Sequence, residues 1–250
     1  MPEYFWKQYE DLPDGLGYMR FSMEHIVTLL VLAALIILAV SLFAVTGRRK
    51  RAVRPCMRVI PWLMIGLEVF KDLFLIREGH FGVGYLPLHL CSLGVFVFIA
   101  ASLAKNDRWR MIWGEIACIL IVPGTIAALI FPDWAHLYPV LNFMNLYSYA
   151  WHGLLLLYPI LMVKSGWVHL SIRHIHYVLL FMVCAAMPVY AFDKLAGCNY
   201  MFVNWPPKGT PLAWIAEMTG DDMYLAGYGA FALAVILLIY LGIGIYHKIR

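Results

Sequence analysis

Seven apolar stretches dominate the sequence, and each is close to the length of about 20 residues that an α-helix needs to cross a bilayer. They are residues 25–46, 57–77, 86–104, 111–131, 141–163, 177–195 and 224–246. Only 14% of the residues are charged and 63% are hydrophobic, whereas about a quarter of the residues in a soluble domain are charged. The sequence therefore predicts an all-α, polytopic membrane protein with seven transmembrane helices.

The stretches form one predicted domain. Residues 1–24 are expected to be an extracytoplasmic segment, and residues 25–250 a single seven-helix domain. The connections are short except for an outer loop at 196–223, which contains "NWPPKGTP" and is expected to hold a short helix near "LAWIAEM". The first apolar stretch is too long for the core of a signal peptide, so no cleaved leader is expected.

The basic residues give the predicted orientation. Thirteen of the 19 Lys and Arg lie in "GRRKRAVRPCMR", "KNDRWR", "KSGWVHLSIRH" and "HKIR", while the N-terminal segment holds five acids and two bases. The positive-inside rule then places the N-terminus outside and the C-terminus inside, in a plasma membrane of bacterial type. Because these bases flank apolar stretches, the expected partner is membrane phospholipid and not nucleic acid.

Two of the predicted helices carry a polar face. Glu68, Lys71 and Asp72 share one face by their spacing of three and four residues, and Asn142, Asn145, Tyr149 and His152 form a stripe at the helical period. Ionisable groups inside a bilayer cost about 2.5–3.5 kcal/mol each and normally face the bundle interior. Asp193 ends another stretch. We expect a polar cavity open to the outer leaflet. The alternative is that Glu68, Lys71 and Asp72 form a structural ion-pair network, and that the stripe from Asn142 to His152 joins helices by hydrogen bonds.

The stretch "YLPLHLCSLGVF" places a cysteine near the predicted start of a helix at Pro87. His89 lies about 200° around that helix from Cys91, so it pairs with the thiol only if the first turn is distorted. His152 can face Cys91 across the bundle. If the helix that holds His152 enters the membrane at Val140, then at 1.5 Å per residue His152 lies about 18 Å below the outer surface and Cys91 about 8 Å. A membrane boundary nearer Asn145 would remove most of this difference. Either histidine remains a candidate base.

The motif "LPLHLCSLGVF" resembles the "PLHLC" signature of the YwaF-like membrane proteins, which are similar to eukaryotic transmembrane protein 164. "ALIFPDW", "YAWHGLLLLYPI" and "NYMFV" resemble further motifs of that family in the same order, over residues 25 to 245. The resemblance implies seven helices and a cysteine-dependent acyltransferase that places fatty acyl chains on ether phospholipids. It implies Cys91 as nucleophile and His152 in "WHG" as its partner, and it draws attention to Asn199 and Tyr200.

The preferred function is therefore a lipid acyltransferase or acyl hydrolase, with Cys91, His152 and His89 as catalytic candidates. The substrate-binding candidates are Asn145, Tyr149, Glu68, Lys71, Asp72, Asp193, Asn199 and Tyr200. The alternatives are a proton-coupled transporter that uses Glu68, Asp72, Glu115 and His152, and a ligand-binding membrane protein without covalent chemistry. No cofactor and no metal are expected, because His174 and His176 are more typical of a solvated loop.

Overall fold

The computed structural model describes residues 2–45 and 49–249 and confirms the all-α prediction, since helices make up 76% of the structure and no strand occurs in these residues. The α-helices are α1 (Met23–Val45), α2 (Arg49–Arg77), α3 (Leu90–Leu103), α4 (Asp107–Ile116), α5 (Val122–Ile130), α6 (Phe143–Lys164), α7 (Ile175–Ala196), α8 (Pro211–Thr219) and α9 (Tyr224–Ile249). A π-helical segment, Ala117–Ile121, joins α4 to α5. Residues 46–48, within the basic segment predicted to face inside, lie outside the described residues.

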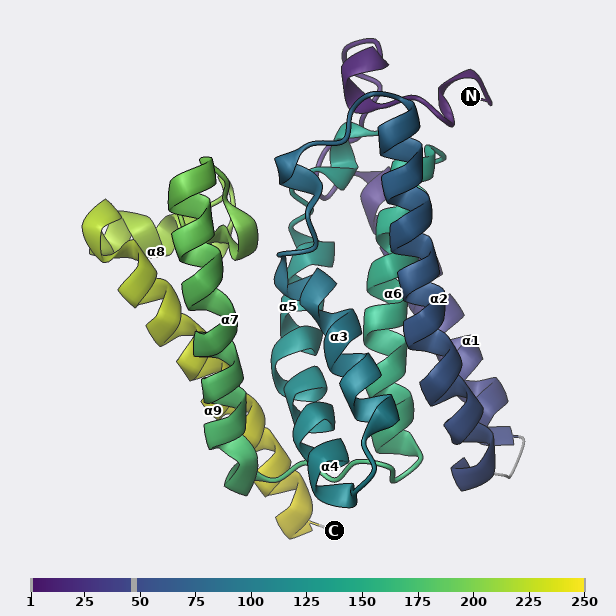
Figure 1. The fold of residues 1–250 in the computed structure, drawn as a ribbon, viewed down its shortest axis with the longest axis vertical. Coiled ribbons are helices and arrows are strands. Elements are labelled where there is room, and N and C mark those ends of the chain that lie inside the picture. The colour runs from purple at the N-terminus through teal and green to yellow at the C-terminus, as the bar shows by residue number, and fades with distance from the viewer. Residues whose placement is uncertain (1, 46–48, 250) are drawn as a thin grey trace.

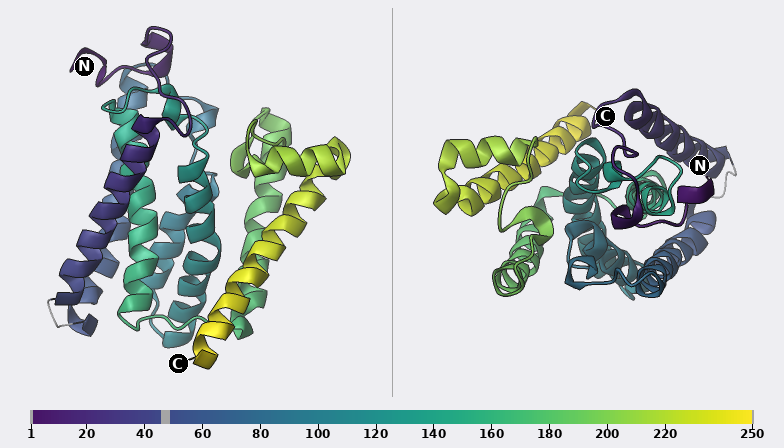
Figure 2. Two further views of the ribbon diagram at one scale, coloured as in Figure 1. Left: turned by 180° about the vertical axis from the view of Figure 1, so that it is seen from behind. Right: turned by 90° about the horizontal axis from the view of Figure 1, so that it is seen from above.

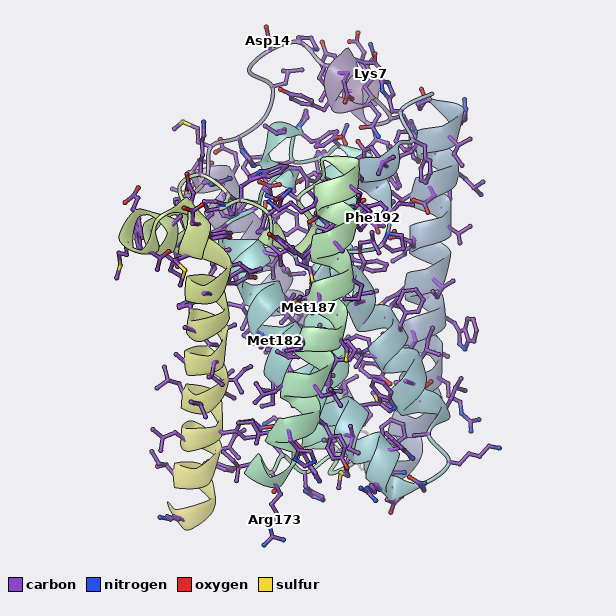
Figure 3. The ribbon with its side chains drawn as sticks, turned by 60° about the vertical axis from the view of Figure 1, so that its left-hand side comes forward. Lys7, Asp14, Arg173, Met182, Met187 and Phe192 are labelled. Atoms are coloured by element: carbon purple, nitrogen blue, oxygen red, sulfur yellow. The ribbon has the colours of Figure 1, made fainter. Side chains whose placement is uncertain are left out.

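Helix α6 lies at the centre of a bundle. The view from above shows α1, α2, α3 and the α4–α5 helix arranged around it (Figure 2), and α6 contacts α1, α2, α3 and α5. α7 and α9 stand to one side of this bundle (Figure 1). The two termini lie at opposite ends, as an odd number of crossings requires. In Figure 3, Lys7 and Asp14 mark the N-terminal end and Arg173 the other.

Within the described residues, five helical segments are long and apolar enough to cross a membrane: Met23–Phe43, Asp107–Leu137, Phe143–Lys164, Ile172–Ala196 and Asp221–Tyr246. The remaining two predicted crossings correspond to α2 and α3, which run alongside them in the bundle (Figure 1). α2 has 29 residues but carries several charges, and α3 has only 14 residues. Seven crossings and the side that each terminus faces therefore stay predictions.

Two helices begin at other residues than the sequence suggested. α2 begins at Arg49, so most of the predicted basic loop is helical, with Pro55 and Pro61 inside the helix. α3 begins at Leu90 and not at Pro87. A residue before proline is biased toward extended backbone, and Leu86 is extended with ψ 147°, as is His89 with ψ 152°. The chain thus runs into the bundle as an extended segment before α3 starts.

The long loop at 196–223 contains the expected short helix, since α8 (Pro211–Thr219) covers all of "LAWIAEM" and packs on α9. α7 ends at Ala196, and the left-handed backbone of its C-cap Gly197 (φ 69°) brings the Cys198 N–H to the Asp193 carbonyl at 3.2 Å. Met201 and Phe202 also have positive φ, which is costly for residues with side chains. The loop therefore has a defined, locally strained shape.

Candidate functional site

Cys91 and His152 lie at the same level of the bundle. α3 and α6 run in the same direction (Figure 1), and they touch where a Cβ at Gly94 would lie 2.8 Å from Cδ2 of Leu155. Cys91 and His152 are each three residues earlier, so they are equally deep. The depth mismatch expected from counting residues disappears because α3 starts at Leu90, below the extended segment.

The hydrogen bonds of His152 define its neutral tautomer. Its Nδ1 lies 2.7 Å from the Ser148 carbonyl oxygen, which can only accept, so Nδ1 carries the proton. Nε2 then carries a lone pair. That atom is buried and has no hydrogen-bond partner among the described residues. A base oriented through its other nitrogen is the usual arrangement for proton transfer to a nucleophile.

His89 has the opposite tautomer. Its Nδ1 accepts a hydrogen bond from the Met201 amide at 3.2 Å, so in the neutral ring the proton is on Nε2. The ring packs edge-on against Tyr200, with centroids 4.9 Å apart. His89 and His152 lie close enough for their charged forms to interact. His152 is therefore the acceptor of the two, and His89 a donor.

Glu68, Lys71 and Asp72 form an ion-pair network, which was the alternative weighed for them. Lys71 Nζ lies 2.7 Å from Glu68 Oε1 and 3.1 Å from Asp72 Oδ1, with its side chain only 8% exposed. Tyr147 on α6 donates a hydrogen bond to the other Glu68 oxygen. Cys91 is near enough to Glu68 and Tyr147 to interact with them electrostatically. The sequence analysis did not identify Tyr147, which lies one helical turn before Trp151 on the same face of α6.

The first part of the α6 stripe holds the N-terminal segment. Asn142 donates to the carbonyls of Tyr4 and Lys7 at 2.7 and 2.9 Å, and caps α6 through the Met144 amide. Tyr18 donates to Asn145 Oδ1 at 2.9 Å and lies 3.0 Å from the Tyr149 hydroxyl. Burial raises the pKa of Tyr18 well above its usual range. These polar side chains therefore anchor residues 2–22 over one end of the bundle.

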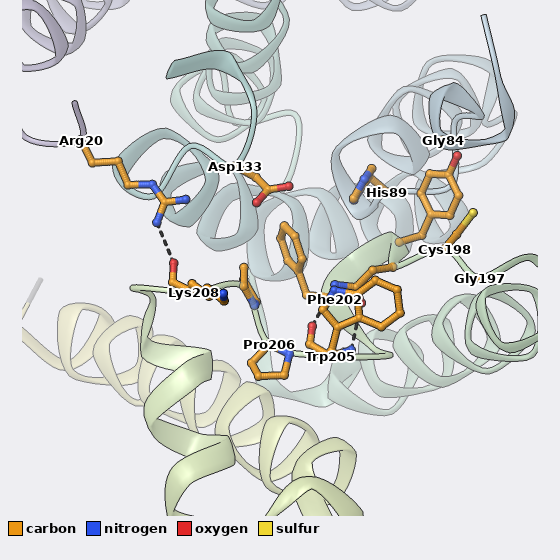
Figure 4. A pocket seen from close by; sticks show the side chains of 13 residues that line it. Arg20, Gly84, His89, Asp133, Gly197, Cys198, Phe202, Trp205, Pro206 and Lys208 are labelled. Atoms are coloured by element: carbon orange, nitrogen blue, oxygen red, sulfur yellow. Dashed lines mark hydrogen bonds between the residues drawn. The ribbon is translucent and has the colours of Figure 1, made fainter. Parts of the chain in front are cut away.

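A pocket of about 640 Å³ lies over the start of α3, between the bundle and the 196–223 loop (Figure 4). Its lining includes His89, Asn199 and Tyr200, which were singled out in the sequence. It also includes Arg20, Asp133, Trp205 and Lys208, which were not, because they are isolated charges or aromatics in three separate segments. Burial raises the pKa of Tyr200 to about 12, and its hydroxyl donates to the Val83 carbonyl.

The predicted site residues therefore do not gather around one cavity. His89, Asn199 and Tyr200 line the pocket, Asn145 and Tyr149 bind Tyr18, and Glu68, Lys71 and Asp72 pair with one another. Asp193 is fully buried, and neither carboxylate oxygen has a hydrogen-bond partner in the described chain.

The other end of the bundle holds a separate polar contact. Glu115 is fully buried and accepts hydrogen bonds from the Ser171 amide at 2.7 Å and from His174 Nδ1 at 2.8 Å. These bonds fasten the start of α7 to α4. Within residues 2–45 and 49–249, no group of three His, Cys, Asp or Glu side chains could hold a metal ion. All five cysteines are free thiols.

The profile of the TMEM164 family matches residues 20–240 of the 250. The chain belongs to the TMEM164 family. This agrees with the resemblance noted in "PLHLC" and "WHG", and it is compatible with the YwaF-like grouping without testing it. No curated protein and no solved structure matches the chain.

Proposed function

We propose that this TMEM164-family protein is a phospholipid acyltransferase or acyl hydrolase of the plasma membrane, with Cys91 as nucleophile and His152 as general base. The observation that carries the proposal is the buried, unpartnered Nε2 of His152 at the depth of Cys91. A buried nitrogen without a partner is costly unless it has a functional partner in another state. A thiol proton is the partner that the neighbouring helix offers.

In the first step, the Cys91 sulfur attacks the carbonyl carbon of an acyl ester while its proton moves to His152 Nε2. The tetrahedral intermediate then collapses, the ester C–O bond breaks, and the leaving alcohol takes the proton back from His152. The product of this half is a thioester on Cys91 and a lysophospholipid.

In the second step, an acceptor hydroxyl attacks the thioester carbonyl and gives its proton to His152 Nε2. The C–S bond breaks, and the Cys91 sulfur recovers that proton. A lysophospholipid hydroxyl as acceptor gives acyl transfer, whereas water gives hydrolysis. The same residues act in both reactions, so the acceptor determines whether the protein is a transferase or a hydrolase.

The start of α3 supplies donors for the oxyanion. His89 precedes the helix and makes no side-chain cap hydrogen bond, so the first-turn amides, including that of Cys91, are not capped by it. His89 also offers Nε2–H. Preorganised donors of this kind are worth about 10²–10³ in rate each. Asn145 and Tyr149 are engaged with Tyr18, and Lys71 with two carboxylates, so these three serve the architecture around the site in this proposal.

The proposal is tested by intact mass measurement of the purified protein after exposure to native phospholipids. We expect a hydroxylamine-sensitive acyl adduct on the wild type that is absent from Cys91→Ser. Cys118→Ser is the matched control, because Cys118 is a partly buried free thiol packed against the same hydrophobic core. An adduct that persists in Cys91→Ser, or a wild type that stays unmodified with every lipid tried, would contradict the proposal.

A proton-coupled carrier is the second candidate, and the partly buried Glu68–Lys71–Asp72 network next to the central helix favours it. Intramembrane ionisable groups commonly mark ion paths. Flux measurements in liposomes separate the two functions. Substrate-dependent flux that is unchanged in Cys91→Ser would support a carrier, whereas an acyl adduct without flux would exclude it.

A further inference from the structure

The pocket over α3 carries charged side chains that form no ion pair with one another in the described structure. The Arg20 guanidinium is held by two carbonyls, with Nε 3.0 Å from the Pro132 oxygen and Nη1 2.8 Å from the Lys208 oxygen. Carbonyls fix its position, and Arg20 forms no ion pair with any described residue. Lys208 and Asp133 form no ion pair with any described residue. The lining therefore presents two cations and one carboxylate as separate groups (Figure 4).

This combination complements a ligand that carries both signs of charge. A guanidinium and an ammonium together suit a phosphate diester, because charge-assisted hydrogen bonds to phosphate are the strong ones. Asp133 suits an ammonium group, and the Trp205 ring, 48% exposed, offers a face for the same cation. A purely anionic ligand would leave Asp133 facing its negative charge.

We propose that the pocket binds a zwitterionic phosphate–ammonium headgroup, with Arg20 and Lys208 on the phosphate and Asp133 selecting the ammonium. The volume of about 640 Å³ is in the range of small-molecule sites. His89 belongs to the pocket wall and immediately precedes α3, so a lipid held here directs its acyl chains toward Cys91. That connection rests on the proposed function, whereas headgroup binding itself does not.

The experiment measures equilibrium binding to Cys91→Ala protein in nanodiscs, so that no turnover occurs. The probes are short-chain phosphatidylethanolamine, phosphatidylcholine and phosphatidylglycerol, with glycerophosphoethanolamine and inorganic phosphate as soluble competitors. We expect the two zwitterionic lipids to bind at least about tenfold more tightly than phosphatidylglycerol, which corresponds to about 1.4 kcal/mol. Glycerophosphoethanolamine should compete better than inorganic phosphate, because only the former has the ammonium.

Three variants of that protein locate the effect. Asp133→Asn should reduce the preference for zwitterionic lipid to less than about twofold, and Lys208→Gln should weaken all three lipids by about tenfold. Arg77→Gln is the control, since Arg77 is an exposed cation that is not part of the pocket lining. Equal unfolding midpoints show that the variants fold.

An unchanged headgroup preference in Asp133→Asn, or phosphate competing as well as the headgroup, would overturn the proposal. Because binding is read without Cys91, the absence of an acyl adduct in the previous experiment would leave this result standing. An adduct on Cys91 together with no headgroup preference would overturn the pocket assignment alone.

Discussion

Helices α6 and α7 are similar as sequences and different as parts of the protein. Each has 22 residues and one internal proline, Pro159 or Pro188. α7 is the more apolar of the two, yet only 11% of its most apolar stretch is buried, against 56% for α6. Exposed side chains such as Leu180, Val183 and Met187 line α7 (Figure 3 labels Met187). Apolarity therefore does not decide which helix occupies the centre.

The polar side chains of α6 account for the difference. Asn142 and Tyr147 bind partners from the N-terminal segment and from α2, while His152 faces the start of α3. Interhelical hydrogen bonds and close packing drive helix association in a membrane, because lipid is as apolar as leucine. α7 offers the bundle a few end contacts, such as that of Glu115 with His174. The comparison predicts that α6 substitutions are costly and matched α7 substitutions are not.

The largest expected effect is on the reaction. His152→Gln should lower the rate of thioester formation by about 10²–10⁴-fold, since a positioned general base contributes that much. His176→Gln on α7 should leave the rate unchanged, because His176 is exposed and outside the proposed machinery. Rapid-quench mass spectrometry measures both rates. Equal rates for the two variants would exclude His152 as the general base.

The next effect is on stability. Lys71→Met leaves Glu68 and Asp72 as two partly buried carboxylates without their shared buried cation, so the loss should approach the cost of about 3–5 kcal/mol for removing one partner of a buried pair. Lys194→Met on α7 should cost much less, because Lys194 is exposed, lies over the Tyr190 ring and forms no ion pair with a described residue. The free energy of unfolding in mixed micelles measures the difference. A small loss for Lys71→Met would mean that water reaches the network.

A purely apolar pair tests the same contrast without charges. Leu155 on α6 is fully buried, and Leu195 on α7 is 90% exposed. Leu155→Ala should lower the free energy of unfolding by about 2–5 kcal/mol. Leu195→Ala should change it by less than about 0.5 kcal/mol. Similar losses of unfolding free energy for both variants would show that the Leu195 side chain is packed against other groups in the membrane-embedded protein.

The smallest effect concerns the segment that covers α6. Burial raises the pKa of Tyr138 above its usual value of about 10, and its hydroxyl donates to Gln8 Oε1 at 2.5 Å. The stabilisation is complete below pH 10 and is lost as the pH rises toward the folded-state pKa, because the unfolded chain deprotonates first. The protection of the backbone amides of residues 2–22 against hydrogen exchange should therefore fall above about pH 10. Tyr138→Phe should reduce this dependence; an identical pH profile would assign it to another group.

Much of the fold followed from the sequence. Each predicted apolar stretch contains a helix, and the whole of "LAWIAEM" lies in α8. The candidate site followed less well. Pro87 suggested a helix start, but the extended segment before Leu90 placed Cys91 deeper, and this brought it level with His152. The sequence did not predict that Arg20, Asp133 and Lys208 line one pocket, because these residues lie far apart in the chain.

The positions of the helices follow from the local sequence, because a long apolar stretch in lipid must satisfy its own backbone hydrogen bonds. The sequence also supplies the residue types available for chemistry, above all Cys91 and the two histidines. The packing of the helices, in contrast, makes α6 central, places Lys71 between two carboxylates and gives His152 and His89 opposite tautomers. These outcomes depend on which hydrogen-bonding group lies opposite each side chain, and that information is carried by helix packing and not by any local pattern.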